Sequence, residues 1–179
     1  MGRSSSRSGV LRRVLLLLVV LVLVGAVASY FVVPEVRERV DSAVTDARRM
    51  FETWSNPGSR ALDKDIVTYW LADPSGDTSP TVSVNFGETI NLETATFHIG
   101  ANTGEDFRHY RRPRTVEFRV PGGTAPIRLV LRDDPAAQEH PIEVDAVRTM
   151  ELRIIDFHAS DADGEPLVAL REIEFTSRP

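Results

Sequence analysis

The sequence predicts an all-β fold, an antiparallel β-sandwich of the jelly-roll type, preceded by one transmembrane helix and a helical stalk. Three observations lead to this prediction. Apolar and polar residues alternate over much of residues 58–179, turn-forming residues interrupt the alternation, and the segments with helical character all lie before residue 58. A chain of 179 residues has room for one domain of ordinary size and an N-terminal extension.

The extension contains an apolar run long enough to cross a bilayer. Residues 14–33 are twenty amino acids without a charge, and a helix rising about 1.5 Å per residue would span the roughly 30 Å hydrocarbon core. A cleavable signal peptide is the alternative, because Arg12 and Arg13 precede the run and residues 26–28 (AVA) suit a signal peptidase. The run continues past that cut. This favours an uncleaved anchor in the cell membrane, with residues 1–13 as a cytoplasmic tail and the C-terminal domain outside.

A helical stalk is expected over residues 34–57, between the anchor and the domain. Apolar residues recur there at spacings of 4, 3, 4, 3 and 4, which form a heptad seam: Val36, Val40, Ala43, Ala47, Met50 and Trp54. A coiled coil held by this seam alone would be marginal, because the seam is short and two of its positions are alanine. The segment is therefore either an amphipathic stalk that packs on another surface or the seam of a weak homo-oligomer.

The apolar period changes to two after residues 55–58 (SNPG), where the domain is expected to begin. Half-buried strands are predicted at residues 82–86, 90–99, 116–120, 127–131, 142–144, 150–154 and 167–175. Turn clusters such as residues 73–76 (DPSG) and 121–123 (PGG) separate them. Short strands at this spacing, with no convincing helix between them, predict an antiparallel sandwich over residues 58–179.

Composition and motif searches exclude several classes of function. The net charge is −5 while the first thirteen residues carry +4, so the remainder carries −9, which disfavours nucleic acid or anionic lipid as a partner. The chain has no cysteine for disulfides or thiolate metal sites. Its four histidines are scattered, and it contains neither a G-x-S-x-G elbow nor a phosphate-binding loop. We therefore expect the protein not to be an enzyme.

Four short segments of the predicted domain carry motifs in a consistent order. They are residues 61–70 (ALDKDIVTYW), 111–118 (RRPRTVEF), 131–138 (LRDDPAAQ) and 169–175 (ALREIEF). The first and last resemble the opening and the closing strand of discoidin-like domains, which are galactose-binding-like β-sandwiches. The middle two resemble the NADase-type glycan-binding subgroup, found mostly in actinobacterial surface proteins. A single lysine against twenty arginines agrees with such a GC-rich source.

The resemblance implies a structural calcium site at the opening motif. In calcium-containing relatives this loop supplies oxygen ligands and a glutamate of the closing strand completes the sphere. Carried over to this sequence, the ligands are Asp63, Asp65, Thr68 and Glu172. Lys64 stands where the family usually has glycine, which restricts the backbone and places a cation beside the site. The alternative is therefore a staple in which Lys64 or a nearby arginine replaces calcium. Trp70 of the same motif is expected to fill the core.

Residues 101–113 form the longest stretch without strand periodicity, and long loops in sandwiches often carry binding sites. Three aromatic residues could stack on sugar faces and two arginines could donate hydrogen bonds. These candidates are Phe107, Arg108, His109, Tyr110 and Arg111. The alternative is that they anchor the loop.

The expected function is thus non-enzymatic recognition of a cell-wall or surface glycan by a membrane-anchored protein. Such a role follows from the resemblance to carbohydrate-binding domains. The alternative is a structural or protein-interaction subunit of an envelope assembly, which would oligomerise through the stalk helix.

Overall fold

The computed structural model describes residues 34–55, 57–75, 79–123, 125–163 and 165–178. The predicted membrane span at residues 14–33 lies outside these ranges. Among the helices that are described, none is both long enough and apolar enough to cross a membrane. The chain divides into two compact units, Met1–Arg48 and Arg49–Pro179.

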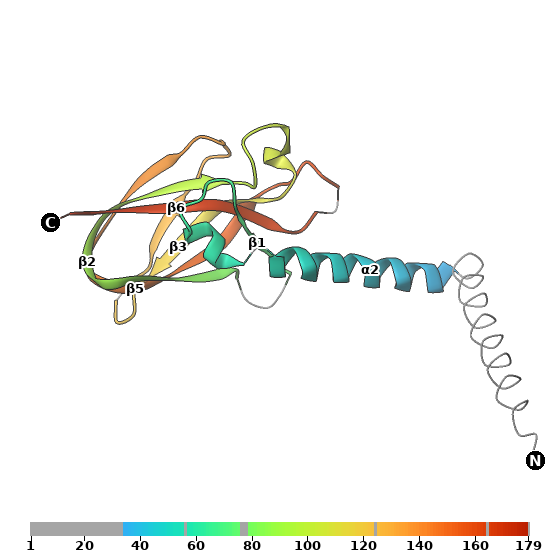
Figure 1. Ribbon diagram of the computed structural model, residues 1–179, viewed down its shortest axis with the longest axis horizontal. Helices are drawn as coiled ribbons and strands as arrows, with labels where there is room; N and C mark the ends of the chain where they lie inside the picture. Colours follow the sequence, from blue (N-terminus) through green and yellow to red (C-terminus); the bar gives the residue numbers. More distant parts are fainter. Residues whose placement is uncertain (1–33, 56, 76–78, 124, 164, 179) are drawn as a thin grey trace, which may run out of the picture. The chain divides into compact units, whose positions relative to one another are not determined.

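Helix α2 (Pro34–Ser55) occupies most of the segment expected to form a stalk (Figure 1). Proline suits the first position of a helix, because its missing N–H would have no partner there, and Glu35 in the first turn complements the helix dipole. No residue of α2 is buried. Five of its large apolar side chains are between 41% and 76% exposed: Val40, Val44, Met50, Phe51 and Trp54. The helix therefore presents an apolar surface.

The β domain is one antiparallel sheet that folds over on itself into a sandwich (Figure 1). Its strands are β1 (Trp70–Ala72), β2 (Thr81–Ile99), β3 (Arg112–Arg119), β4 (Ile127–Val130), β5 (Gln138–His158) and β6 (Val168–Arg178). Hydrogen bonds join them in the order β1-β6-β2-β5-β3-β4. The first half of β2 pairs with the second half of β5, whereas its second half lies between β6 and the first half of β5. The two long strands therefore run through both layers.

The prediction of seven short strands was wrong in one respect. The segments predicted at residues 82–86 and 90–99 are joined in β2, and β5 likewise joins two predicted strands. Gly87 has a φ of +80° at the bend of β2, a conformation that glycine adopts without strain. In β5, Glu143 and Ala146 also have positive φ values, and the β2–β5 register shifts nearby. Such bulges interrupt the alternation of side chains, so each bent strand has the sequence pattern of two.

The core lies between the two layers and contains the alternating apolar residues of the strands. Phe97 and Phe118 are almost completely buried, and their ring centroids are 5.9 Å apart. Burial of one such side chain stabilises a fold by about 1.5–3 kcal/mol. Trp70 is only 6% exposed and belongs to the same cluster. The opening motif thus fastens the start of the domain to its core.

Candidate functional site

Three connections meet at one end of the sandwich: the β2–β3 loop, the β4–β5 turn and the β5–β6 loop. The Arg111 main-chain N–H donates to the Leu167 carbonyl at 2.9 Å, which ties the end of the first loop to the start of β6. The Asp161 N–H donates to the Arg108 carbonyl at 2.9 Å. These bonds hold the β2–β3 loop against the β5–β6 connection.

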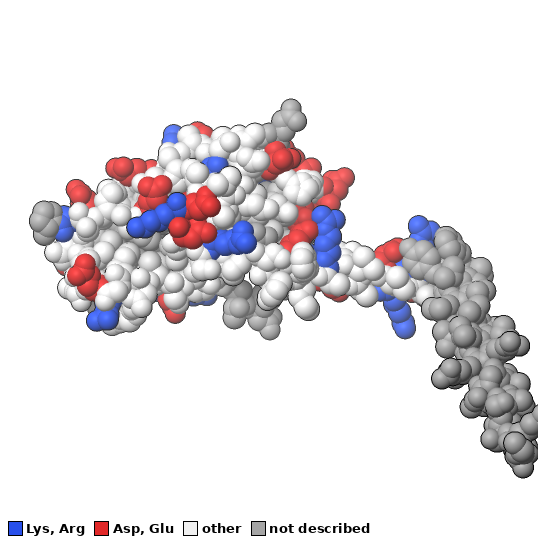
Figure 2. Space-filling model, in the orientation of Figure 1, with Lys and Arg blue, Asp and Glu red and all other residues white. Residues whose placement is uncertain are grey.

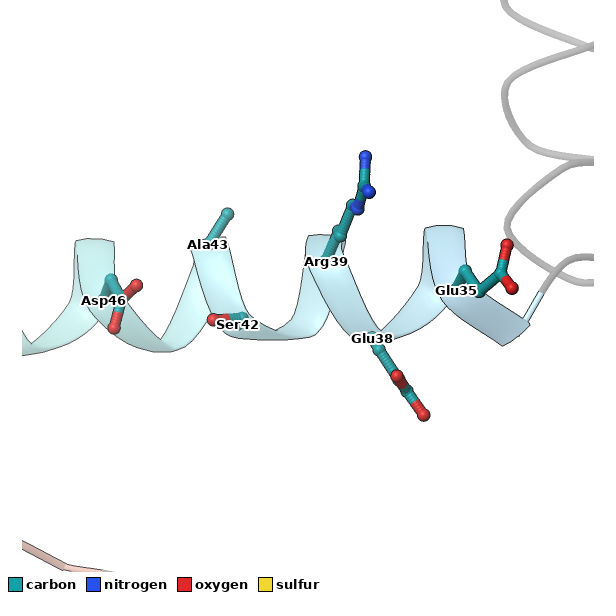
Figure 3. A pocket seen from close by; sticks show the side chains of 6 residues that line it. All are labelled: Glu35, Glu38, Arg39, Ser42, Ala43 and Asp46. Atoms are coloured by element: carbon teal, nitrogen blue, oxygen red, sulfur yellow. The ribbon is translucent and has the colours of Figure 1, made fainter.

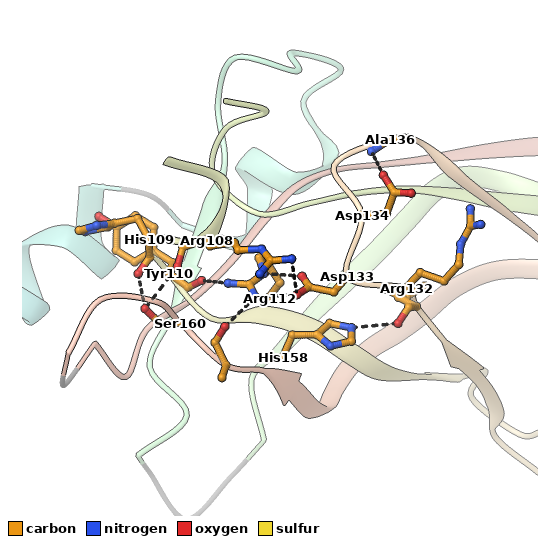
Figure 4. A network of polar contacts seen from close by, with 12 residues as sticks. Arg108, His109, Tyr110, Arg112, Arg132, Asp133, Asp134, Ala136, His158 and Ser160 are labelled. Atoms are coloured by element: carbon orange, nitrogen blue, oxygen red, sulfur yellow. Dashed lines mark hydrogen bonds and ion pairs between the residues drawn. The ribbon is translucent and has the colours of Figure 1, made fainter. Parts of the chain in front are cut away.

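The buried guanidinium of Arg112 joins all three connections (Figure 4). Its side chain is 1% exposed, and Nε and Nη2 donate to the two carboxylate oxygens of Asp133 at 2.7 and 3.0 Å. Nη1 donates to the Tyr110 carbonyl at 2.7 Å, and Nη2 also donates to the Ala159 carbonyl at 2.6 Å. The guanidinium carbon lies 5.2 Å from the centre of the Phe107 ring. A charge that is costly to bury is therefore fully paired.

Asp133 is the anionic centre of this network. The hydrogen bonds from Arg112 hold the pKa of Asp133 below its ordinary value, although burial acts in the opposite direction. The charges of Arg112, His158 and Arg108 lower this pKa further. Arg108, a predicted ligand contact, lies with Nη2 3.7 Å from Asp133 Oδ2 and is half exposed. It is thus an outer partner of the same carboxylate.

Phe107 anchors the loop, which was the alternative to ligand contact that the sequence left open. Its side chain is 5% exposed, and its ring packs so closely on Gly100 that a Cβ there would lie 2.8 Å from a ring carbon. Gly100 also has a φ of +77°, which favours glycine. The Phe107 ring is therefore covered and does not face solvent. Arg111, half-buried, pairs through its main chain with Val168 of β6.

His109 and Tyr110 line a cleft of about 250 Å³, together with Tyr69, Ala101, Asn102 and Asp106. The Tyr110 ring lies 6.2 Å from the Tyr69 ring and 4.7 Å from the His109 ring, which meets it edge to face. The three rings thus form a continuous aromatic wall. Tyr69 comes from the opening motif, where sequence reasoning considered only calcium ligands and core packing.

The opening loop brings several oxygen atoms together around Thr68. The Thr68 hydroxyl oxygen lies 2.8 Å from Asp63 Oδ2, 3.0 Å from the Asp65 carbonyl oxygen and 3.3 Å from the Arg60 carbonyl oxygen. The Asp65 carboxylate itself accepts the Val67 N–H at 3.0 Å. Two predicted calcium ligands, Asp63 and Thr68, are therefore in contact, whereas Asp65 contributes its main-chain oxygen to the cluster.

Glu172 of β6, the fourth predicted ligand, is a buried carboxylate at 2% exposure. Its Oε1 accepts the Ile173 N–H at 3.2 Å, whereas its buried Oε2 has no hydrogen-bond partner among the described residues. Burial raises the pKa of Glu172, and the nearby charge of Asp63 raises it further. The same carboxylate lines a largely apolar groove of about 720 Å³ between the opening loop, β2 and β6. An unpaired buried oxygen of this kind favours a proton or a cation beside it.

Lys64 adopts the backbone conformation that glycine would favour, with a φ of +63°. Its main-chain N–H, rather than its ammonium group, interacts with Glu172. Within the described ranges no ion pair joins Lys64 or an arginine to Asp63 or Glu172, so the structure contains no such staple. Nor is any group of three or more His, Cys, Asp or Glu residues in those ranges placed to hold a metal ion. A calcium ion would therefore need neutral oxygens as well.

Two other surfaces do not form a binding site. The hollow on α2 is lined by Glu35, Glu38, Arg39, Ser42, Ala43 and Asp46. Figure 3 shows these side chains pointing to different sides of one helix, so they do not converge on a ligand. On the face drawn in Figure 2, acidic side chains are interspersed with basic ones and no continuous basic stripe is visible.

Comparisons with known proteins support the fold. No family model matches the sequence, and no curated protein matches it. A mycobacterial arabinofuranosyltransferase, AftD, aligns at 11% identity and a TM-score of 0.50, over 69% of this chain but only 9% of that one. An F5/8 type C domain from Bacteroides fragilis aligns at 14% identity and a TM-score of 0.49, over 67% of this chain and 80% of that one.

A further neighbour is the family 32 CBM of NanJ from C. perfringens, solved with galactose. It aligns at 16% identity and a TM-score of 0.49, over 67% of this chain and 84% of that one. At such identities a likeness concerns the fold alone. The neighbours are of the discoidin-like kind that the motifs predicted, while the subgroup and the actinobacterial source stay predictions.

We expect Asp133→Asn to weaken the pH dependence of stability on the acid side. Because the folded pKa of Asp133 is lowered, its carboxylate contributes stability above the unfolded pKa, and the contribution is lost as pH falls through the folded pKa. Urea denaturation from about pH 2 to pH 7 should show a loss that is largest at neutral pH. Asp134→Asn is the control, since Asp134 accepts the Ala136 N–H and has no ion pair in the described structure. Parallel pH profiles for wild type and Asp133→Asn would contradict the assignment.

Proposed function

We propose that this protein is a non-enzymatic glycan-binding module whose ligand lies in the cleft at the end of the sandwich. The aromatic wall formed by Tyr69, His109 and Tyr110 is the observation that carries the proposal. Aromatic rings pack on the apolar faces of sugar rings, and polar groups at the rim then fix the orientation of the hydroxyls. Asn102 and Asp106 supply such groups.

The size of the cleft suits a small portion of a glycan. Its volume of about 250 Å³ lies just below the range of about 300–1,000 Å³ that is usual for small-molecule sites. One sugar unit at the end of a chain would fill it. Galactose is the sugar in the C. perfringens neighbour, but the proposal rests on the cleft and not on that likeness.

The lining of the cleft favours binding over hydrolysis. Most glycosidases use two carboxyl groups on either side of the scissile bond, about 5–9.5 Å apart. Of the described residues that line the cleft, Asp106 alone is acidic. A second carboxylate for acid and base catalysis is therefore not supplied by this lining.

We place the module outside the cell, tethered to the cell membrane by residues 14–33. The support is the sequence: twenty residues without a charge precede a domain that, with the stalk, carries −9. The glycan would then belong to the cell wall or the cell surface. A second candidate function, a subunit of an envelope assembly, is favoured by the exposed apolar side chains of α2, such as Met50, Phe51 and Trp54.

We also propose that the opening loop binds a structural calcium ion. Calcium takes six to eight oxygen ligands and accepts carboxylate, carbonyl and hydroxyl oxygens. Asp63 and Thr68, the carbonyl of Asp65 and the unpaired oxygen of Glu172 fit that chemistry. Bound calcium would neutralise the two carboxylates and fasten the opening loop to the last strand.

Removing an aromatic ring of the cleft should weaken glycan binding without unfolding the protein. Tyr110→Ala and His109→Ala should each weaken binding on a glycan array or to an immobilised polysaccharide by about tenfold, as expected for a loss of about 1.4 kcal/mol. Trp54→Ala is the control, because Trp54 is 76% exposed on α2 and does not line the cleft. Undiminished binding by Tyr110→Ala, with an unchanged melting temperature, would rule out this cleft.

Calcium at a concentration of 100 times Kd should stabilise the folded wild-type protein by about 2.7 kcal/mol and thereby raise its melting temperature. A chelator should reverse the rise. Glu172→Gln should remove the response. Without calcium, the wild type should lose stability as pH rises through the folded pKa of Glu172, because that pKa is raised above its unfolded value. Glu172→Gln should remove this loss. Glu151→Gln, at an exposed position of β5 away from the groove lining, should behave like wild type in both tests. A calcium response that survives in Glu172→Gln would refute the site.

A further inference from the structure

The cleft has an acidic character that general sugar binding does not require. Asp106 is its single acidic lining residue, and no lysine or arginine lines it among the described residues. The described part of the chain also contains no ion pair to Asp106. The carboxylate is thus available to a ligand.

The nearest arginines of the loop are directed elsewhere. Arg108 and Arg112 both extend toward Asp133 on the far side of the network from His109 (Figure 4). Arg112 is further held by the carbonyls of Tyr110 and Ala159. Asp133 therefore draws two guanidinium groups away from the cleft, and they do not compete with a positively charged ligand there.

The aromatic wall adds to this preference. The face of an aromatic ring is negative, and a cation above it is attracted to the ring quadrupole. Tyr69 and Tyr110 lie with their centroids 6.2 Å apart and at 40° to each other, so they present ring surface to one volume. A carboxylate beside two such rings is an arrangement that suits an ammonium group.

We propose that the cleft selects glycans with a free amino group, such as glucosamine units whose nitrogen is not acetylated, over N-acetylated and neutral sugars. This rests on the proposed glycan-binding function and specifies its ligand class. The ammonium group pairs with Asp106, while the apolar face of the sugar packs on Tyr110 and Tyr69. An N-acetyl group is neutral and larger, so it loses the ion pair.

The test is calorimetric titration of the whole protein with three ligands: a glucosamine trisaccharide, the matching N-acetylglucosamine trisaccharide and galactose. At a slightly acidic pH, where the amine is protonated, the glucosamine ligand should bind at least tenfold more tightly than the other two. Asp106→Asn should lower that preference at least tenfold and leave the affinity for the N-acetylated ligand nearly unchanged. Added salt should reduce the preference in wild type.

Asp163→Asn is the matched control. Asp163 is an exposed carboxylate of the neighbouring β5–β6 loop and does not line the cleft. If the acidic domain attracted amino sugars only through its net charge, Asp106→Asn and Asp163→Asn would lose the same affinity, and the inference would fail. Equal affinities for the three ligands would overturn it while the glycan-binding function stands. Equally tight binding of a simple amine such as ethanolamine would show that the cleft recognises the amine and not the sugar, and would overturn the inference. If no glycan binds at all, the proposed function itself fails.

Discussion

The paired guanidinium of Arg112 is the interaction on which the cleft end of the sandwich depends. It lies at the start of β3 and holds the turn that contains Asp133, the carbonyl of Tyr110 and the carbonyl of Ala159. Each of these groups belongs to a different connection or to its boundary. A planar group with five donors can satisfy such a set, whereas the ammonium of a lysine cannot match the two oxygens of a carboxylate in the same way. The loop conformation that creates the aromatic wall follows from this geometry.

The two motifs that resemble those of the glycan-binding subgroup meet at this ion pair. Arg112 comes from residues 111–118 and Asp133 from residues 131–138. Gln138, at the end of the second motif, closes the turn, since its side chain accepts the Arg132 N–H at 2.7 Å and donates to the Arg132 carbonyl at 2.9 Å. The motifs therefore specify a scaffold. Residues that line the cleft, such as Tyr69 and Asp106, lie outside these two motifs.

Periodicity predicted where most of the sheet lies but not how its strands connect. Alternation identified the half-buried segments correctly, because one face of each is in the core. It failed at Gly87 and near Ala146, where positive φ values bend β2 and β5 without ending them, and a strand as short as β1 (Trp70–Ala72) has too few residues to show a period. The failures at Gly87 and near Ala146 share a cause, because the local sequence does not show that a bent strand stays paired with a distant one.

The site was predictable in part. The gap in strand periodicity placed candidates in the loop that lines the cleft, and the resemblance brought Asp63, Thr68 and Glu172 into consideration together. It could not separate Phe107, which is buried against Gly100, from Tyr110, which lines the cleft, because that difference depends on how the loop closes on β6. Arg112 was not among the sequence candidates, since arginine is rarely fully buried, and only its partners from distant turns reveal its role.

Hydrogen exchange of Arg112→Lys tests the central claim most directly. The account predicts that the amides of His109, Arg111 and Asp161, which are hydrogen-bonded in the loops, lose protection while the amides of β2 and β5 keep theirs. Arg114→Lys is the control, because Arg114 pairs with Asp156 on the exposed side of the same strand, and it should leave the loops protected. Unchanged protection of the three loop amides in Arg112→Lys would contradict the account.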